Sequence, residues 1–449
     1  MTPAATDVTT SPVSLRHRIA LFSLLLGAVA CLPSCGGSED ESETTEFDRD
    51  AVLPEAPPPP PAPPEETIGL GITMEERTFV RVEPDANARA IGLIRTGARF
   101  EATARREVAG KIWWKLRGSG WVIDDEVRVR DEEPTLSFTP RLPNRESGMP
   151  YPIGRVIASE GVPVFRRPPR QGQDTGPLTL RTLQEGYFFT VNRIINIYQQ
   201  ELYQGTRYWW IPRTGTTTVR GPDFHGIEVD ENTVIPFLWV TDPTAKLCSA
   251  PRRPNAEPPG CVSVERHSRL TYAATEQAAG QWYRTREGKY IASLQVSRVE
   301  RVDRPEGIFA NERWVHVDLL NQFAALYEGD RMTYVTLISS GDDEHPTPTG
   351  LFRVESKHVS ATMDNEDNLS SAFFIQDVPW VVYFRGSYAL HGAFWHDRFG
   401  LRTSHGCVNL APDDARRFFN FVDSPVLEEP LHAVFTPPGT RSTAVYVTR

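Results

Sequence analysis

The sequence predicts a mainly β protein made of several small domains. Between residues 68 and 129, short runs of alternating apolar and polar residues are separated by glycine turns, which is the period-two pattern of strands. A helical pattern stands out at residues 411–422, where a proline and two acidic residues mark a helix start. The chain has 449 residues, enough for two to four domains, and its 38 prolines indicate linkers and many turns.

Residues 1–35 are typical of an export signal that ends in a lipid attachment site. Arg16-His17-Arg18 precede a short apolar run at residues 19–30, which is too short to span a bilayer comfortably. Cys35 lies in a stretch that resembles a lipobox and would become the acylated N-terminus of a lipoprotein. Cys31 is a competing attachment site, and an ordinary secretory signal with incidental cysteines is the simpler alternative.

Residues 36–66 form an acidic and then proline-rich linker. Residues 54–64 are nearly all proline, which favours a semi-rigid spacer of ~3.1 Å per residue. Such a spacer would hold a folded unit away from the membrane to which the protein is anchored. The membrane is therefore an expected partner, bound through the N-terminal lipid. Gly36 follows the cysteine where inner-membrane lipoproteins of the enterobacterial type carry Asp. The expected location is therefore the cell envelope, at the periplasmic face of the outer membrane.

Three regions after the linker show the same order of short strands with decreasing clarity. In residues 67–132 the order Val-Arg-Val, Ile-Gly-Leu, Trp-Trp-Lys-Leu and Gly-Trp-Val resembles that of bacterial SH3 domains, which are small β-barrels. Residues 150–226 repeat the order in a longer frame, and residues 227–305 are a possible third copy. The resemblance implies wall-binding modules. Spacers or packing partners for a catalytic domain are the alternative.

The cysteines and the net charge limit the possible partners. Cys248 and Cys261 bracket a proline-rich loop, and in an oxidising compartment they are expected to form a disulfide. Cys407 is then left as a free, reactive thiol. The formal net charge is -10 and no basic stripe with interleaved aromatic residues occurs, which argues against nucleic acid as a partner.

Residues that can perform chemistry gather in the segment 391–410. A strand-like run leads to His391-Gly392, and a turn-rich loop then leads to Ser404-His405-Gly406-Cys407. A cysteine is a strong nucleophile as the thiolate, and a nearby imidazole can take its proton. Glycine next to the cysteine lets the backbone approach a substrate oxygen. This combination predicts a cysteine nucleophile with a histidine base.

The segment resembles the signature of the L,D-transpeptidases, the YkuD-type cysteine enzymes of bacterial cell walls. Their pattern is His-Gly, a loop, Ser/Thr-His-Gly-Cys, an apolar residue and Arg or Asn. The fixed positions are filled here by His391, Gly392, Ser404, His405, Gly406, Cys407, Val408 and Asn409. Residues 314–322, 339–341 and 346–352 resemble upstream segments of the family in the right order. The resemblance covers residues 308–436 and implies a β-sandwich with a short helix after the catalytic cysteine.

The resemblance also implies a reaction. Cys407 would attack a donor stem peptide of peptidoglycan and form a thioester, D-Ala would leave, and an acceptor amine would take the acyl group. His391 would be the general base. The other imidazole nitrogen would donate a hydrogen bond to the carbonyl of Gly392. Ser404 Oγ is the alternative acceptor. No cofactor is implied.

Further residues are assigned to the oxyanion hole and the pocket. The backbone N–H groups of His405, Gly406 and Cys407 would stabilise the oxyanion. The His405 side chain would share a face with Cys407 in an extended segment, so it could be a base, but the resemblance favours a pocket-lining role. Asn409, Trp380 and Tyr383 are also candidates for the pocket, although each aromatic residue could instead be core.

Other functions remain open at this point. An L,D-carboxypeptidase or endopeptidase of the same fold would use water in place of the amine. A wall-binding scaffold with a vestigial enzyme domain belongs to another class. Zinc binding by His391, His396, His405 and Cys407 is disfavoured because the spacings match neither HExxH nor paired CxxC, so no metal is expected. A papain-like protease has its cysteine before its histidine, which is the reverse order.

Overall fold

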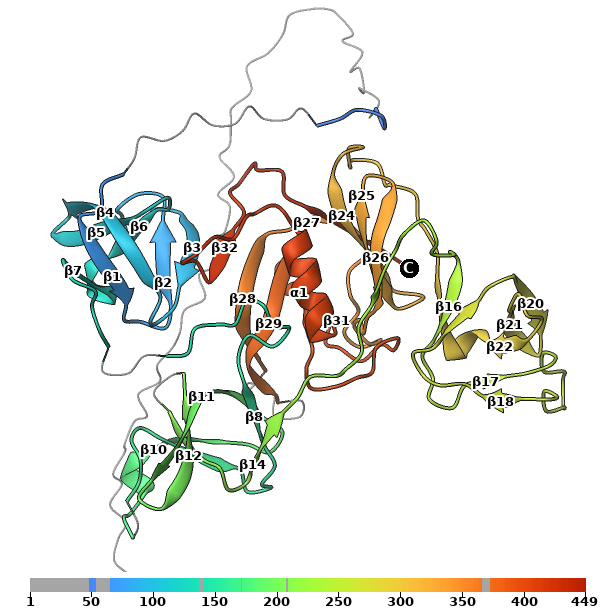
Figure 1. Cartoon of the computed structure of the whole chain (residues 1–449), viewed down its shortest axis with the longest axis horizontal. Helices are drawn as coiled ribbons and strands as arrows, with labels where there is room; N and C mark the ends of the chain where they lie inside the picture. The colour runs from blue at the N-terminus through green and yellow to red at the C-terminus, as the bar shows by residue number, and fades with distance from the viewer. Residues whose placement is uncertain (1–47, 54–64, 137–139, 171, 207–208, 366–371) are drawn as a thin grey trace, which may run out of the picture. The chain divides into compact units, whose positions relative to one another are not determined.

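The computed structural model describes residues 48–53, 65–136, 140–170, 172–206, 209–365 and 372–449 (Figure 1). The expected signal, with Cys31 and Cys35, and most of the linker lie outside these ranges. Within them the protein is mainly β, with one α-helix, α1 (Pro412–Phe421), and the 3-10 turns η1 (Asp124–Glu126), η2 (Gly176–Leu178) and η3 (Ser293–Gln295). None of the helices in the described part of the chain has the length and apolar character needed to cross a membrane.

The first module, residues 67–132, is a small sheet whose strands pair in the order β7-β1-β4-β5-β6-β2-β3. Phe100 and Ala102 of β4 are buried whereas Arg99 and Glu101 are exposed, as the period-two pattern predicts. The strands are β1 (Gly69–Thr73), β2 (Thr78–Arg81), β3 (Ala90–Ile94), β4 (Arg99–Val108), β5 (Lys111–Leu116), β6 (Trp121–Ile123) and β7 (Val127–Arg130).

The second module, residues 150–226, has strands in the order β14-β8-β11-β12-β13-β9-β10. Position by position, this is the order of the first module. Val164, Leu183 and Ile211 are completely buried in its core. The strands are β8 (Ile153–Val156), β9 (Val162–Phe165), β10 (Thr179–Leu183), β11 (Phe188–Ile197), β12 (Gln200–Gly205), β13 (Trp210–Pro212) and β14 (Thr216–Val219).

The third module, residues 227–305, follows the same order with its fourth strand split in two. Strands β23-β16-β19 pair, as do β20-β21-β22, and β17 and β18 form a hairpin. A disulfide with an S–S distance of 2.01 Å joins Cys248 to Cys261 beside that hairpin. The strands are β16 (Phe237–Val240), β17 (Lys246–Leu247), β18 (Val262–Ser263), β19 (Arg269–Thr271), β20 (Ala274–Ala278), β21 (Gly280–Arg284), β22 (Tyr290–Ala292) and β23 (Val296–Val299).

The C-terminal domain, residues 308–449, contains a six-stranded sheet in the order β15-β26-β25-β24-β33-β27. Alternate residues of β24 face opposite sides: Val315 and Val317 lie in one core and Trp314 in another. The strands are β15 (Ile227–Glu228), β24 (Arg313–Asp318), β25 (Phe323–Glu328), β26 (Arg331–Leu337), β27 (Gly350–Arg353) and β33 (Ala444–Thr448). Strand β33 shows that the domain continues past residue 436, the end expected from the sequence, and β15 pairs with this sheet rather than with the third module.

A second group of strands, β32-β28-β29-β30-β31, packs against this sheet and makes a sandwich. Helix α1 lies against β29 (Figure 1) and also contacts β30, and it contributes Ala415, Phe418 and Phe419 to the shared core. The strands are β28 (Ser356–Asp364), β29 (Phe374–Arg385), β30 (Tyr388–Gly392), β31 (Val408–Leu410) and β32 (Ala433–Phe435).

All three modules contact the C-terminal domain. Strand β3 of the first module pairs with β32, and β11 of the second pairs with β29 at Phe188 and Ile375. In the third module, Phe237 and Trp239 pack on the outer face of the six-stranded sheet, next to Trp314 and Phe323. The first two modules therefore pair with strands of the domain, and the third shares an apolar core with it.

A short segment of the linker contacts the end of the third module and the start of the C-terminal domain. The Leu53 N–H donates to Asn311 Oδ1 at 3.0 Å, and Asn311 Nδ2 donates to the Leu53 carbonyl at 3.2 Å. The Arg304 guanidinium donates to the carbonyl of Arg49 at 2.9 Å. The sequence predicts a spacer over this region, but residues 49–53 are docked on residues 304–311.

Candidate active site

The parallel pairing of β30 with β31 brings the two parts of the signature together. Leu390 pairs with Val408 and His391 pairs with Asn409. Leu390 and Val408 face the sandwich core. Because side chains alternate along a strand, His391, Cys407 and Asn409 lie on the opposite face of this pair of strands.

His391 is a buried, neutral imidazole. Its exposed fraction is 2%. Burial lowers its pKa to about 4, despite the nearby Gly392 carbonyl, which raises it. Nδ1 lies 3.4 Å from that carbonyl, whereas Ser404 Oγ has other partners, so Gly392 is the residue next to Nδ1. With the Nδ1 proton directed at this carbonyl, Nε2 would be free to accept a proton.

Cys407 is partly buried and its thiol is protonated at neutral pH. Burial raises its pKa above the ordinary value of 9.0. The hydrogen-bond acceptor of Sγ among the described residues is the Ser387 carbonyl at 3.5 Å, not His391. The free protein therefore holds a neutral thiol and a neutral imidazole rather than an ion pair.

Ser404 fixes the turn that leads into Cys407. Its hydroxyl donates to the Cys407 carbonyl at 2.5 Å and accepts from the Gly406 N–H at 3.1 Å. Gly406 has φ +113, a backbone conformation that residues other than glycine rarely adopt. Because the Gly406 N–H is already bonded, the expectation that it joins the oxyanion hole does not fit this geometry. Across the described residues we find no acceptor for the N–H groups of His405 and Cys407.

Thr347 supports the same turn from the other side. Its hydroxyl accepts from the Gly341 N–H at 2.9 Å and donates to the Gly406 carbonyl at 2.8 Å. One side chain therefore joins two segments of the family resemblance, residues 339–341 and 346–352, to the cysteine turn. The sequence motif contains Thr347, but its role as a link becomes apparent only in the folded structure.

The two aromatic candidates for the pocket lie on opposite faces of β29. Tyr383 is partly buried, packs in the same apolar cluster as Cys407, and has its pKa raised to about 12 by burial and by Cys407. Trp380 faces the core instead, where its ring lies 5.1 Å from that of Phe419. The indole N–H of Trp380 donates to the Gly148 carbonyl at 2.8 Å. The structure therefore places Trp380 in the core rather than in a pocket.

Two histidines of the segment have distinct surroundings. His405 is exposed, and its ring centre lies 4.7 Å from that of His345 and 5.6 Å from that of Phe373. His396 is partly buried, with Nε2 2.9 Å from Asn409 Nδ2. Asn409 thus supports the loop rather than lining an open pocket.

In the described part of the chain, no three His, Cys, Asp or Glu side chains form a group that could hold a metal ion.

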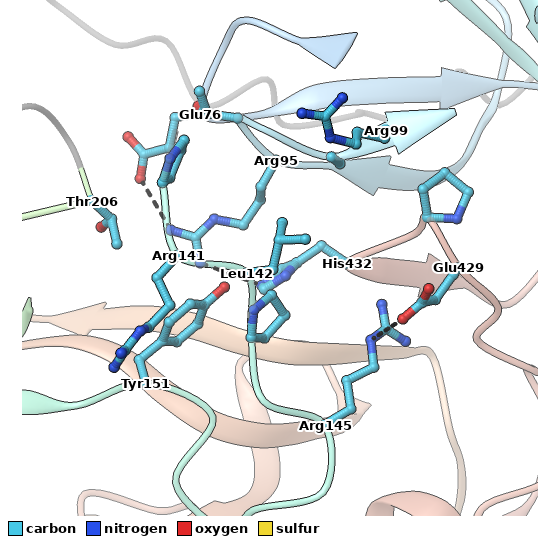
Figure 2. A pocket seen from close by; sticks show the side chains of 15 residues that line it. Glu76, Arg95, Arg99, Arg141, Leu142, Arg145, Tyr151, Thr206, Glu429 and His432 are labelled. Atoms are coloured by element: carbon cyan, nitrogen blue, oxygen red, sulfur yellow. Dashed lines mark hydrogen bonds and ion pairs between the residues drawn. The ribbon is translucent and has the colours of Figure 1, made fainter. Parts of the chain in front are cut away.

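A separate cavity of about 290 Å³ lies among the first module, the 140–151 connection and the C-terminal domain. Its lining includes several arginines, and Figure 2 shows Arg95 directed at Glu76 and Arg145 directed at Glu429. Arg95 is also paired with Asp377. None of the residues of the Cys407 turn lines this cavity, so it is separate from the site at residues 391–409.

Residues 391–409 thus bring a thiol on the cysteine turn and an imidazole on β30 to one face of the β30–β31 pair, next to two backbone N–H groups that have no acceptor among the described residues. Residues 312–447 match the family model of the YkuD L,D-transpeptidase catalytic domain. This part of the chain is therefore a YkuD-type L,D-transpeptidase catalytic domain. The match ends eleven residues beyond the expected boundary at 436, consistent with the place of β33 in the sheet.

Known proteins resemble parts of the chain. Probable L,D-transpeptidase 3 of Mycobacterium tuberculosis (strain ATCC 25618 / H37Rv) is 36% identical over 93 residues, which are 19% of this chain and 34% of that protein. L,D-transpeptidase 1 of the same strain is 32% identical over 96 residues, 19% of this chain and 36% of that protein. The chain thus spans about a third of the length of these curated relatives. The NMR structure of the catalytic domain from E. faecium L,D-transpeptidase is 24% identical, with a TM-score of 0.23, and the match covers 31% of this chain and 98% of that one.

Proposed function

We propose that the protein is a peptidoglycan L,D-transpeptidase in which Cys407 is the nucleophile and His391 the general base. The observation that carries the proposal is the register of β30 and β31, in which both side chains are on one face, beside a turn whose His405 and Cys407 N–H groups have no acceptor among the described residues. The family match of residues 312–447 supports the reaction class.

In the first half of the reaction, His391 Nε2 takes the proton of the Cys407 thiol as the sulfur attacks the carbonyl carbon of the donor stem peptide. The carbonyl oxygen becomes an oxyanion, which accepts hydrogen bonds from the N–H groups of Cys407 and His405. The tetrahedral intermediate collapses to a thioester. His391 returns the proton to the leaving amine, and D-Ala departs.

In the second half, an acceptor amine attacks the thioester carbonyl. His391 removes a proton from the amine, and the Cys407 sulfur leaves and is protonated again. The product is a new amide bond between two stem peptides. Because burial disfavours the imidazolium, His391 returns its proton readily at each step.

The neutral resting pair suits this cycle. A free thiolate would react with any electrophile that reached the site, whereas the Cys407 thiol here is held against the Ser387 carbonyl. Attack then requires the thiol to turn from this carbonyl toward His391 when a donor is bound. We expect donor binding to promote this change.

Hydrolysis is the alternative outcome of the same thioester. Water in place of the amine would give an L,D-carboxypeptidase or an endopeptidase. A wall-binding scaffold is the alternative of another class, and in that role the modules would matter more than Cys407.

Mass spectrometry of muropeptides after incubation with the full chain tests these three functions. Cross-linked products with loss of D-Ala are expected from the wild type and absent with Cys407→Ala. Shortened stems without cross-links would instead favour the hydrolase, and an unchanged digest that co-sediments with the protein would favour the scaffold.

We further propose that the chain is a lipoprotein of the cell envelope, anchored through Cys35 at the periplasmic face of the outer membrane. The sequence of residues 1–35 supports this location. Cys35→Ala should block processing or release the protein into the soluble periplasmic fraction. If Cys31→Ala has that effect and Cys35→Ala does not, Cys31 is the attachment site, and if neither has any effect the protein is not lipidated.

A further inference from the structure

The loop between His391 and Cys407 contacts the third module. This catalytic loop, residues 393–406, leaves β30 and returns at β31. The sequence shows it as a turn-rich connection in the C-terminal domain. In the folded protein, residues 397–400 of the loop rest on residues of the third module that lie more than a hundred positions earlier in the chain.

Arg266 makes the polar part of this contact. Its Nη2 donates to the Asp397 carbonyl at 2.7 Å, and its Nη1 lies 3.2 Å from Asp397 Oδ2. Its Nε donates to the backbone carbonyl of Thr241, in the same module, at 3.0 Å. Because the guanidinium is planar and held at both ends, it fixes the loop backbone relative to the module.

Close packing accompanies the polar contact. Phe399 is completely buried, and its ring stacks on that of Phe224 at 5.6 Å. Phe224 in turn contacts Trp239 of the third module at 5.6 Å. Gly400 has φ +96, and a Cβ built there would lie 2.2 Å from Thr241 Cγ2, so the loop and the module leave no room for a side chain.

The anchored residues are next to those that surround the base. The ring centre of Trp395 lies 5.8 Å from that of His391. His396 contacts Asn409, which pairs with His391 across β30 and β31. A displacement of residues 397–400 would therefore be passed directly to Trp395, which packs against the imidazole, and to His396, which contacts Asn409.

We infer that the third module positions the catalytic loop, and that Arg266 is a positioning residue for the reaction. The inference rests on the proposed function for the chemical step, but not for the contact itself. It gives the third module a role inside the enzyme in addition to any binding of the wall.

The effect of Arg266 on the loop can be measured without any turnover. Hydrogen exchange of peptides that cover residues 393–404 should be compared in the wild-type full chain and in Arg266→Ala. The Gly400 N–H, which donates to the Ile338 carbonyl at 2.7 Å, should be protected in the wild type. Loss of the charge-assisted bonds should accelerate exchange in this loop by roughly tenfold or more, with the rest of the C-terminal domain unchanged.

The kinetic readout separates positioning from a merely structural contact. In Arg266→Ala, kcat should fall about tenfold while KM stays within about twofold, because the loop orients the base rather than the donor. Arg266→Lys should recover part of the loss, since a single ammonium cannot contact both Asp397 and Thr241 as the guanidinium does.

Arg269→Ala is the matched control, because Arg269 is an exposed arginine of the same module on β19 and makes no ion pair in the described part of the chain. It should change neither exchange nor kcat. If Arg266→Ala does not fold, Asp397→Ala provides the test: it removes the carboxylate and leaves the backbone carbonyl, so a smaller change in the same direction is expected.

The inference is overturned if loop exchange is unchanged in Arg266→Ala, or if exchange rises while kcat does not fall. A wild type that forms no cross-linked product refutes the proposed function but not the contact, because exchange is measured without substrate. The two failures are thereby distinguished.

Discussion

Arg95 of the first module and Asp377 of strand β29 form a buried ion pair, with Nη1 2.5 Å from Oδ1. The Asp377 carboxylate also accepts hydrogen bonds from Thr190 Oγ1 at 2.6 Å and from Ser360 Oγ at 2.7 Å. Thr190 belongs to the second module, so one carboxylate joins both modules to the catalytic domain. Burial raises the pKa of Asp377, but Arg95 and these hydroxyls outweigh it and hold the pKa at about 2.

Loss of Arg95 should destabilise the protein strongly. Arg95→Ala leaves the Asp377 carboxylate buried without its counter-ion, which typically costs about 3–5 kcal/mol, and urea unfolding would measure the loss. Arg99→Ala is the control, because Arg99 and its partner Glu133 are largely exposed and the expected change is about 1 kcal/mol or less. Equal effects of the two substitutions would show that the buried pair has no special contribution.

Replacement of the nucleophile should separate activity from folding. Cys407→Ser should abolish turnover, because an imidazole cannot ionise a hydroxyl as readily as a thiol. The substitution is nearly isosteric, so the circular dichroism spectrum and the melting temperature should match those of the wild type. Near-normal cross-linking by this variant would exclude Cys407 as the nucleophile.

The Thr347 link should matter for activity more than for the stability of the fold. Thr347→Val keeps the shape of the side chain but leaves the Gly341 N–H and the Gly406 carbonyl without this partner, at a cost of about 1–3 kcal/mol in the local structure. We expect kcat for cross-linking to fall at least tenfold. Thr349→Val, two residues further along the same segment, is the comparison, and an equal loss there would argue against a specific link.

Stability should fall as the pH drops below 6.5. His391 and His316 are each 2% exposed, and burial lowers the pKa of each from 6.5 to about 4. Between these values the unfolded chain binds protons that the folded chain does not, so unfolding becomes more favourable as pH falls, by about 1.4 kcal/mol per pH unit for each histidine. Urea unfolding at pH 7, 6, 5 and 4 would measure the slope. His316→Gln should reduce it, and an unchanged slope would contradict burial as the cause.

Thiol labelling should distinguish the described cysteines. Cys248 and Cys261 are joined, so iodoacetamide should label Cys407 in the native mature protein but neither of these two. After reduction all three should react, and the protein should lose about 3 kcal/mol of stability by chain-entropy reasoning. Labelling of Cys248 without reductant would show that the bond does not form in the cell envelope.

The sequence was enough to group the signature residues of the segment 391–409, because they are close together in the chain. A motif cannot show which face of a strand a residue occupies unless the register is known. Trp380 and Tyr383 are an odd number of residues apart on β29, so they point to opposite faces, and the register of Tyr383 with Ala389 puts only Tyr383 on the side of Cys407. Parity along the expected strand was the signal that could have separated these two candidates.

Contacts between distant segments were beyond local reasoning. Arg95 lies in a short turn and reads as a surface residue, yet its partner is 282 residues away. The role of Ser404 as a support of the turn depends on where the Cys407 carbonyl lies, which spacing alone does not reveal. The repeated strand order of the modules was weakly visible in residues 67–132 and 150–226, because few identical residues are needed to maintain the same pairing.

The docking of residues 49–53 on residues 304–311 changes the reach of an anchored enzyme. If Cys35 is held at a membrane, the chain between this anchor and the docked residue Arg49 has a contour of about 50 Å, counted at ~3.5 Å per residue. A tether that ran undocked to Thr67, where the first module begins, would have about twice this contour length. The contacts made by Arg304 and Asn311 then determine the radius within which the catalytic domain can search the wall. Tension in the tether would be transmitted at these two residues without passing through the first module.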